Sequence, residues 1–230
     1  MVVDLQIVIF IQELFLKHKN TKNVQAMAAY MKTTMPFYGI RVPARRFIIR
    51  QAIKQYPIKN QEEYRAVINA LWNKPHREEK YAAIDVARAY PEYIDLISLP
   101  LYEQMIRQGA WWDFVDDIAL HLIGFLLNNH QLTMWPILEK WLRDNNLWIR
   151  RTVIICQNRL KIKTDSKYLF DFCLYHAKEK NFFIRKAIGW ALREYAKSEP
   201  AKVIEFLVKN KDQFSNLSYK EAVKKINKKF

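Results

Sequence analysis

A repeat of 35 residues runs through the sequence and restricts its possible folds more than any other feature. Stepping by 35 residues without a gap finds only small or aliphatic side chains, at Ile48, Ala83, Ile118, Val153, Ile188 and Val223. Seven residues further on, a second column is mostly large and apolar, at Gln55, Tyr90, Phe125, Leu160, Tyr195 and Phe230. Positions seven apart lie on the same side of an α-helix, so the columns predict one buried stripe in each repeat.

The length of this repeat predicts an all-α fold. A unit of ~35 residues holds two helices and a turn, which is typical of an α-solenoid of HEAT-like repeats. The dipeptides Asn-Gly and Asp-Gly, which signal β-hairpins, are absent from the sequence. We therefore expect residues 1–230 to form a single domain, a superhelix of about six two-helix units with a concave basic cleft. A helical bundle in accidental register is the alternative.

The net charge indicates the kind of partner. Lys and Arg number 38 against 23 acidic residues, which gives a formal charge of +15. Such an excess in an aromatic-rich chain favours a polyanion or an anionic surface. Two cysteines, Cys156 and Cys173, form no disulfide framework, so we expect a reduced, cytoplasmic location. No apolar run reaches the ~18 residues of a membrane span, and the apolar segment 5–16 is interpreted as a first helix.

The helix face opposite the buried stripe carries most of the chemistry. At ~100° per residue, positions six and two before the first column, and two and five after it, point away from the core. They include Arg46, Arg50, Trp112, Asp116, Arg151, Lys186, Trp190 and Arg193. Such a cationic face suits a phosphate backbone, and therefore DNA. A groove for an acidic protein and a merely solvated face are the alternatives. The lysines near the end, among them Lys224, Lys225 and Lys228, belong to a last phosphate-contacting helix or to a tail.

One acidic residue stands out on this face. Asp116 follows Trp112 by one helical turn, and Asp113 lies where a helix cap is expected. In one interpretation, Trp112 belongs to the core and Asp116 only pairs with Arg151, which occupies the same column in the next repeat. In the other it has a chemical role, because an acid that repels a polyanionic ligand needs a compensating function. No HExxH, CxxC, glycine-rich phosphate loop or serine elbow is present, so we expect no metal and no cofactor.

Four segments of the sequence are distinctive: WWDFVD at 111–116, DNNLWIRR at 144–151, FFIRKAIGWALREYAK at 182–197 and AAYMKTTMPFYGIRVPARR at 28–46. They resemble the AlkD-like family of bacterial DNA alkylation repair glycosylases. The resemblance implies a superhelix of HEAT-like repeats that excises cationic N3- and N7-alkylated purines from duplex DNA without metal or cofactor. The family's catalytic aspartate and its two active-site tryptophans match Asp116, Trp112 and Trp190.

The resemblance also implies a set of DNA contacts. The family's arginines match Arg151 and Arg193, and its N-terminal tyrosine matches Tyr30. Arg159 stands where the family often has lysine. We add Arg46, Arg50 and Lys186 from the cationic face, and expect a monomer because DNA fills the cleft. Some similar proteins keep the fold without excision activity, so a non-catalytic protein that binds damaged or distorted DNA is the alternative.

Overall fold

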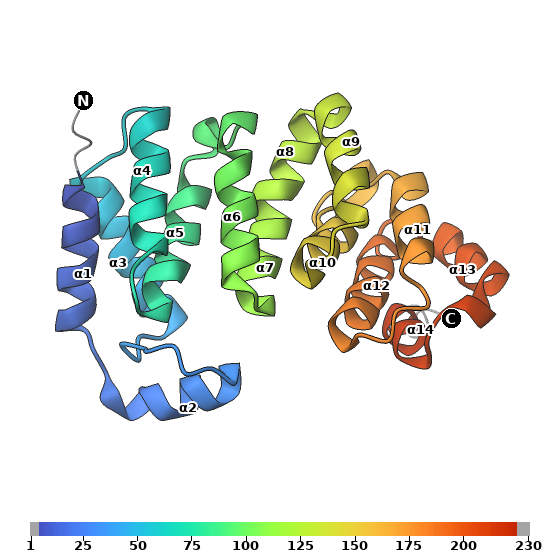
Figure 1. Cartoon of the computed structure of the whole chain (residues 1–230), viewed down its shortest axis with the longest axis horizontal. Helices are drawn as coiled ribbons and strands as arrows, with labels where there is room; N and C mark the ends of the chain where they lie inside the picture. The colour runs from blue at the N-terminus through green and yellow to red at the C-terminus, as the bar shows by residue number, and fades with distance from the viewer. Residues whose placement is uncertain (1–4, 225–230) are drawn as a thin grey trace. The chain divides into compact units, whose positions relative to one another are not determined.

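The computed structural model describes residues 5–224, and this range is helical without any β-strand (Figure 1). The all-α prediction is confirmed. The chain divides into two compact units, residues 1–101 and 102–230, which are described separately. The single domain spanning 1–230 therefore stays a prediction. The expectations for Lys225, Lys228 and Phe230 lie outside the described residues.

Within the described residues, the N-terminal unit contains five complete α-helices. They are α1 (Gln6–Lys17), α2 (Thr21–Met31), α3 (Val42–Gln55), α4 (Gln61–Trp72) and α5 (Arg77–Ala89). α1 packs on α3 and α4, and α5 packs on the same two helices. Glu78 is fully buried, and its carboxylate accepts backbone N–H groups of Tyr38, Gly39 and Ile40 at 2.8 to 3.0 Å. This buried acid fixes the segment between α2 and α3.

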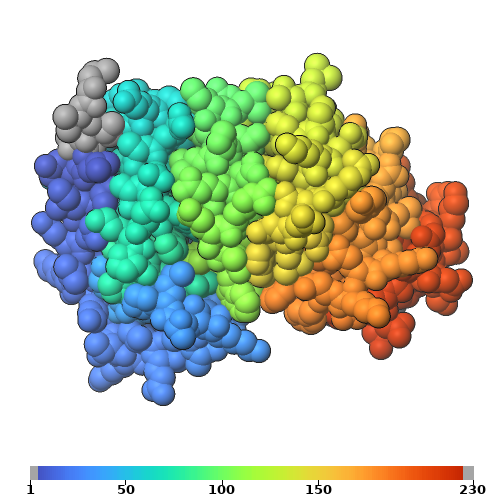
Figure 2. All heavy atoms as spheres, viewed as in Figure 1, coloured from blue at the N-terminus to red at the C-terminus, as the bar shows by residue number. Residues whose placement is uncertain are grey.

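The C-terminal unit begins within α6 (Leu99–Gly109) and stacks pairs of helices. The remaining helices are α7 (Trp112–Ile118), α8 (Gly124–Asn129), α9 (Gln131–Leu142), α10 (Leu147–Ile155), α11 (Ser166–Tyr175), α12 (Phe182–Tyr195), α13 (Pro200–Lys209) and α14 (Asn216–Val223). α7, α10, α12 and α14 form one row in which each helix packs on the next. α9 and α11 flank α10, while α11 and α13 flank α12. In the space-filling view, the atoms of α9 to α12, coloured yellow to orange, lie closely against one another on the face shown (Figure 2).

The first repeat column is buried as predicted. Ile48, Ala83, Ile118, Val153 and Ile188 are each at most 1% exposed, and Val223 is half-buried. These residues lie on α3, α5, α7, α10, α12 and α14, one on each helix. The 35-residue spacing therefore corresponds to equivalent helices of successive repeats.

The second column is only partly buried, and the structure gives the reasons. Tyr90 and Tyr195 are buried, whereas Gln55 is exposed. A single π-helical turn, Ala119–Ile123, joins α7 to α8. Because a π turn contains an additional residue, the buried stripe moves by one position, and Leu126 is buried while Phe125 is only half-buried. α10 ends at Ile155, so Leu160 lies beyond the helix that was expected to carry it.

Two helical glycines allow helices of the C-terminal unit to approach each other closely. A Cβ atom at Gly124 would overlap the carbonyl oxygen of Cys156. One at Gly189 would lie 2.6 Å from the carbonyl oxygen of Ser218 and 2.5 Å from Cβ of Glu221. These approaches place α8 against the end of α10, and α12 against α14.

We predict that Gly124→Ala and Gly189→Ala each destabilise the protein. Alanine favours a helix by up to ~1 kcal/mol over glycine, but the methyl group meets backbone atoms that cannot rotate away. Overpacking of this kind costs about 1–3 kcal/mol, so urea denaturation should show a net loss. Thr133→Ala, at an exposed position of α9, is the control and should leave stability unchanged or higher. Gains in stability at both glycines would contradict this account of the helix packing.

Candidate functional site

Trp112 and Asp116 lie one turn apart on α7 in the C-terminal unit. The N-cap position of this helix is Trp111, so Asp113 lies within the first turn and does not cap it as expected. An acid in the first turn is favoured there by the helix dipole. Asp117 points elsewhere, because its carboxylate pairs with His121 at 2.7 Å on the next turn. The three neighbouring acids thus have different environments.

Asp116 and Arg151 form a bidentate ion pair between α7 and α10. Arg151 Nε donates to Asp116 Oδ1 at 2.7 Å, and Arg151 Nη2 donates to Oδ2 at 2.8 Å. Arg151 Nη1 donates to the carbonyl oxygen of Phe183 at 2.6 Å, at the start of α12. The Arg151 and Asp116 side chains are 6% and 14% exposed. All three guanidinium nitrogens are therefore engaged within the protein.

The environment of Asp116 combines burial with a strong cationic partner. Burial raises the pKa of the Asp116 carboxyl above its ordinary value, while the hydrogen bonds and charge of Arg151 oppose this change. An ionised carboxylate has about four acceptor positions, and Arg151 occupies one on each oxygen. Acceptor capacity therefore remains on the exposed edge of Asp116. This edge can face a cation or hold a water molecule.

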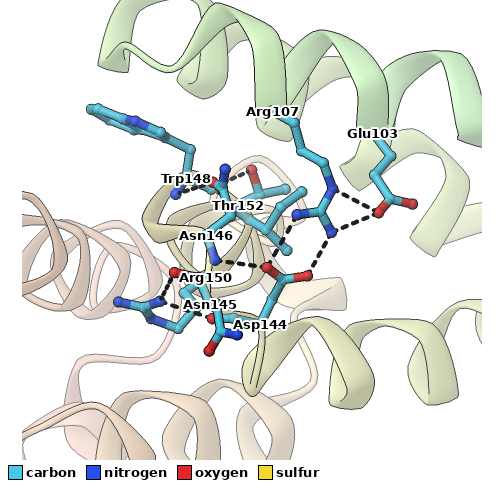
Figure 3. Close-up of polar contacts among 9 residues, drawn as sticks. Glu103, Arg107, Asp144, Asn145, Asn146, Trp148, Arg150 and Thr152 are labelled. Atoms are coloured by element: carbon cyan, nitrogen blue, oxygen red, sulfur yellow. Dashed lines mark hydrogen bonds and ion pairs between the residues drawn. The ribbon is translucent and has the colours of Figure 1, made fainter.

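A second polar network holds the segment that precedes Arg151. The Arg107 guanidinium lies between the carboxylates of Glu103 and Asp144, at 2.7 Å and 2.5 Å (Figure 3). The hydrogen bond from Arg107 holds the pKa of Asp144 below its ordinary value, against the effect of burial. Asp144 accepts the backbone N–H of Asn146, and Asn146 caps α10 by accepting the N–H of Trp148. The start of α10 is thereby attached to α6.

On α12, Lys186, Trp190 and Arg193 follow one another at helical spacing. Lys186 Nζ donates to Glu221 Oε2 of α14 at 2.5 Å, and Arg193 Nη1 contacts the other oxygen of this carboxylate. The Trp190 indole N–H donates to Glu194 at 3.3 Å. Lys186 and Trp190 are both half-buried, so each presents part of its side chain to solvent. This face of α12 combines two cations with an oriented indole.

The family model of the DNA alkylation repair enzyme matches residues 11–226. The chain belongs to this family. Among solved structures, it is similar to a predicted DNA alkylation repair enzyme from Enterococcus faecalis, with a TM-score of 0.83 and 32% identity. That alignment covers 91% of this chain and 97% of the other. No curated protein matches the chain.

Membership in the DNA alkylation repair family supports a role in the repair of alkylated DNA, with DNA as the partner. None of the helices in residues 5–224 combines the length and apolar composition needed to cross a bilayer. In the same range, no group of His, Cys, Asp and Glu side chains has a metal-binding arrangement.

The structure divides the residues expected to contact DNA between the two units of this family member. Tyr30 on α2 is 70% exposed, Arg50 is exposed on α3, and the exposed Arg46 lies 3.9 Å from Asp85. Arg159, in the C-terminal unit, is exposed beyond the end of α10. Lys186 and Arg193 share the Glu221 carboxylate. Each of these side chains remains a predicted DNA contact.

Arg151 is a further predicted DNA contact, and its guanidinium lies against Asp116 and the carbonyl oxygen of Phe183. These contacts use three of its five N–H donors, and the DNA contact stays a prediction. The pairing of Asp116 with Arg151 is the contact that their shared repeat column suggests. Sequence reasoning missed Glu221 as the common partner of Lys186 and Arg193, although its position 35 residues after Lys186 carried the same signal.

We predict that Arg151→Ala strongly destabilises the protein and that Asp116→Asn partly reverses this loss. Removing one partner of a buried ion pair costs about 3–5 kcal/mol, because the other charge remains buried and unpaired. In the double variant that charge is gone, so the two effects should not add. Urea denaturation of the wild-type protein, the two single variants and the double variant gives the four free energies of unfolding from which the coupling between the two side chains is calculated. Additive losses would show that the two side chains are energetically independent.

The same variant has a defined pH dependence. Without Arg151, the pKa of the folded Asp116 rises further above its unfolded value, so the folded state binds more protons. A raised pKa gives stability at low pH that is lost as pH rises through the folded pKa. The deficit of Arg151→Ala relative to the wild-type protein should therefore be smaller at about pH 5.5 than at about pH 7.5. An equal deficit at both values would contradict the coupling.

Proposed function

We propose that this protein is a monofunctional DNA glycosylase that hydrolyses the N-glycosidic bond of N3- and N7-alkylated purines in duplex DNA. The observation that carries the proposal is the partly accessible Asp116 carboxylate, held at both oxygens by Arg151 and placed one turn from Trp112. Substrates would include 3-methyladenine and 7-methylguanine. The protein would act as a monomer, without metal or cofactor.

The chemistry follows from the charge of the lesion. An N3- or N7-alkylpurine is cationic, so its glycosidic bond is weakened and the departing base becomes neutral. The group that needs stabilisation is the oxocarbenium ion that develops on the deoxyribose. A fixed carboxylate next to the sugar stabilises this cation electrostatically and can orient or deprotonate the attacking water. We assign this role to Asp116.

Arg151 acts through Asp116 in this mechanism. Burial disfavours the ionised carboxylate, and a bidentate guanidinium favours it. Arg151 therefore keeps Asp116 charged in a partly buried site and fixes the direction of its free acceptor positions. It is a positioning residue for Asp116, and it remains a proposed DNA contact.

The two tryptophans supply selectivity for a cationic substrate. An indole face attracts a cation by about 0.5–2 kcal/mol, so Trp112 and Trp190 can hold the charged base or sugar. An unmodified purine offers neither the positive charge nor the weakened bond. The proposed DNA contacts are Tyr30, Arg46, Arg50, Arg151, Arg159, Lys186 and Arg193.

A non-catalytic protein that binds damaged DNA is the second candidate. One observation favours it: the Asp116 side chain is only 14% exposed and is already paired. In a purely structural role, the Asp116–Arg151 pair would join α7 to α10, and the cationic residues would bind distorted duplex. Such a protein would bind methylated DNA and release no base.

The test of the proposal is release of free base from methylated duplex DNA, separated by chromatography. We predict that the wild-type protein releases 3-methyladenine and 7-methylguanine. Asp116→Asn should release 7-methylguanine at least about 10²-fold more slowly, because the group opposing the sugar cation has lost its charge. Duplex affinity should be unchanged or higher, since one acid has been removed from a surface that faces phosphates.

Asp117→Asn is the matched control. It removes the same charge from the adjacent residue, whose carboxylate pairs with His121 about 100° around the helix. This variant should retain the wild-type rate of release. Full activity in Asp116→Asn would refute the mechanism, and wild-type protein that binds methylated duplex without releasing base would establish the second candidate.

A further inference from the structure

Glu221 is a buried carboxylate that lies among lysine and arginine side chains of the C-terminal unit. Its side chain is only 5% exposed, although it belongs to the last described helix, α14. Among the described residues, three cationic side chains contact it. Lys186 and Lys224 donate to Oε2 at 2.5 and 2.8 Å, and Arg193 contacts Oε1. One acid thus joins two cations of α12 to one that directly follows α14.

The position of Glu221 is set by the packing of the backbone. Gly189 of α12 allows α14 to approach so closely that a Cβ atom there would lie 2.5 Å from Cβ of Glu221. Ser218 Oγ donates to the carbonyl oxygen of Arg185 at 3.0 Å, which attaches α14 to α12 a second time. Ser215 caps α14 by accepting the N–H of Ser218. The carboxylate is therefore fixed, and the longer cationic side chains adjust to it.

The cluster of Lys186, Arg193, Lys224 and Glu221 is positively charged as a whole. Three positive charges and one negative charge leave a net charge of +2. Burial and the charges of Lys224, Arg193 and Arg151 lower the pKa of Lys186, although its contact with Glu221 favours the charged form. The side chains of Lys186, Arg193 and Lys224 are 35%, 19% and 57% exposed. Donors that Glu221 does not use therefore remain accessible.

We propose that Glu221 is a positioning residue that gathers Lys186, Arg193 and Lys224 into a binding site for one backbone phosphate of DNA. This rests on the proposed function for its ligand, duplex DNA. Without the central carboxylate, the three cations repel one another, and their long side chains regain rotamer freedom that binding must then remove. A phosphate would then meet three separated positive charges instead of three cationic side chains held close together.

The proposal makes an unusual electrostatic prediction. By net charge alone, Glu221→Gln should strengthen binding of a polyanion, because it removes one negative charge. If Glu221 positions the cations, the same substitution weakens binding. Glu205→Gln is a matched control, since it makes the same change at an exposed position of α13. The sign of the difference between these two variants separates the two accounts.

The experiment measures affinity for an undamaged duplex over a range of salt concentrations, with thermal melts to verify folding. We expect Glu221→Gln to bind several-fold more weakly than the wild-type protein and to lose about 0.9 from the slope of log affinity against log salt. Glu205→Gln should bind as tightly as the wild-type protein or more tightly. In base release from methylated duplex, Glu221→Gln should raise KM and leave kcat unchanged.

A second pair of variants decides the question if Glu221→Gln fails to fold. Lys224 is exposed, and Lys224→Gln leaves Glu221 paired with Lys186 and Arg193. It should reduce the salt slope by about 0.9, while Lys209→Gln at an exposed position of α13 should not. Equal slopes for the two lysine variants, or a folded Glu221→Gln that binds like Glu205→Gln, would overturn the proposal. These affinity measurements need no base release, so failure of the glycosylase mechanism would be seen separately.

Discussion

Asp116 and Arg151 form a buried ion pair on which the candidate site of the C-terminal unit depends. Moving two such charges out of water costs several kcal/mol for each ion, and their attraction offsets this cost only when the hydrogen bonds between them are short and well aligned. The geometry is good because both residues occupy the same repeat position on neighbouring helices, and Arg151 also binds the carbonyl oxygen of Phe183. The pair therefore joins α7, α10 and the start of α12, and it directs the one accessible edge of the carboxylate.

The same arrangement recurs two helices further along the row. Lys186 and Glu221 are again 35 residues apart and again paired, so two acid–base contacts of identical spacing connect the equivalent helices. In the first contact the acid precedes the base, and in the second the order is reversed. The first leaves an acid with spare acceptors beside Trp112, whereas the second leaves an excess of cations around Glu221. One repeat geometry thus supports both a proposed reaction centre and a proposed phosphate site.

Much of this organisation can be predicted from sequence, because it depends on spacing. The buried column from Ile48 to Ile188 follows from helical periodicity, and the shared column of Asp116 and Arg151 made their contact one of two foreseeable outcomes. The π turn after Ile118 interrupts the regular helical periodicity, so the 35-residue spacing could not predict it. The pairing of Glu221 with Lys186 follows from their 35-residue spacing, whereas the burial of Glu221 could not be predicted, because it depends on the close approach at Gly189.

The measurement that tests the central claim most directly is the pH dependence of single-turnover 7-methylguanine release, corrected for spontaneous loss. Asp116 must be ionised to act, and burial raises its pKa. The rate should therefore fall on the acidic side with a midpoint above ~3.9, the value of an unperturbed aspartate, and Asp116→Asn should lack this decline. A rate without an acidic decline, or the same decline in Asp116→Asn, would contradict the account.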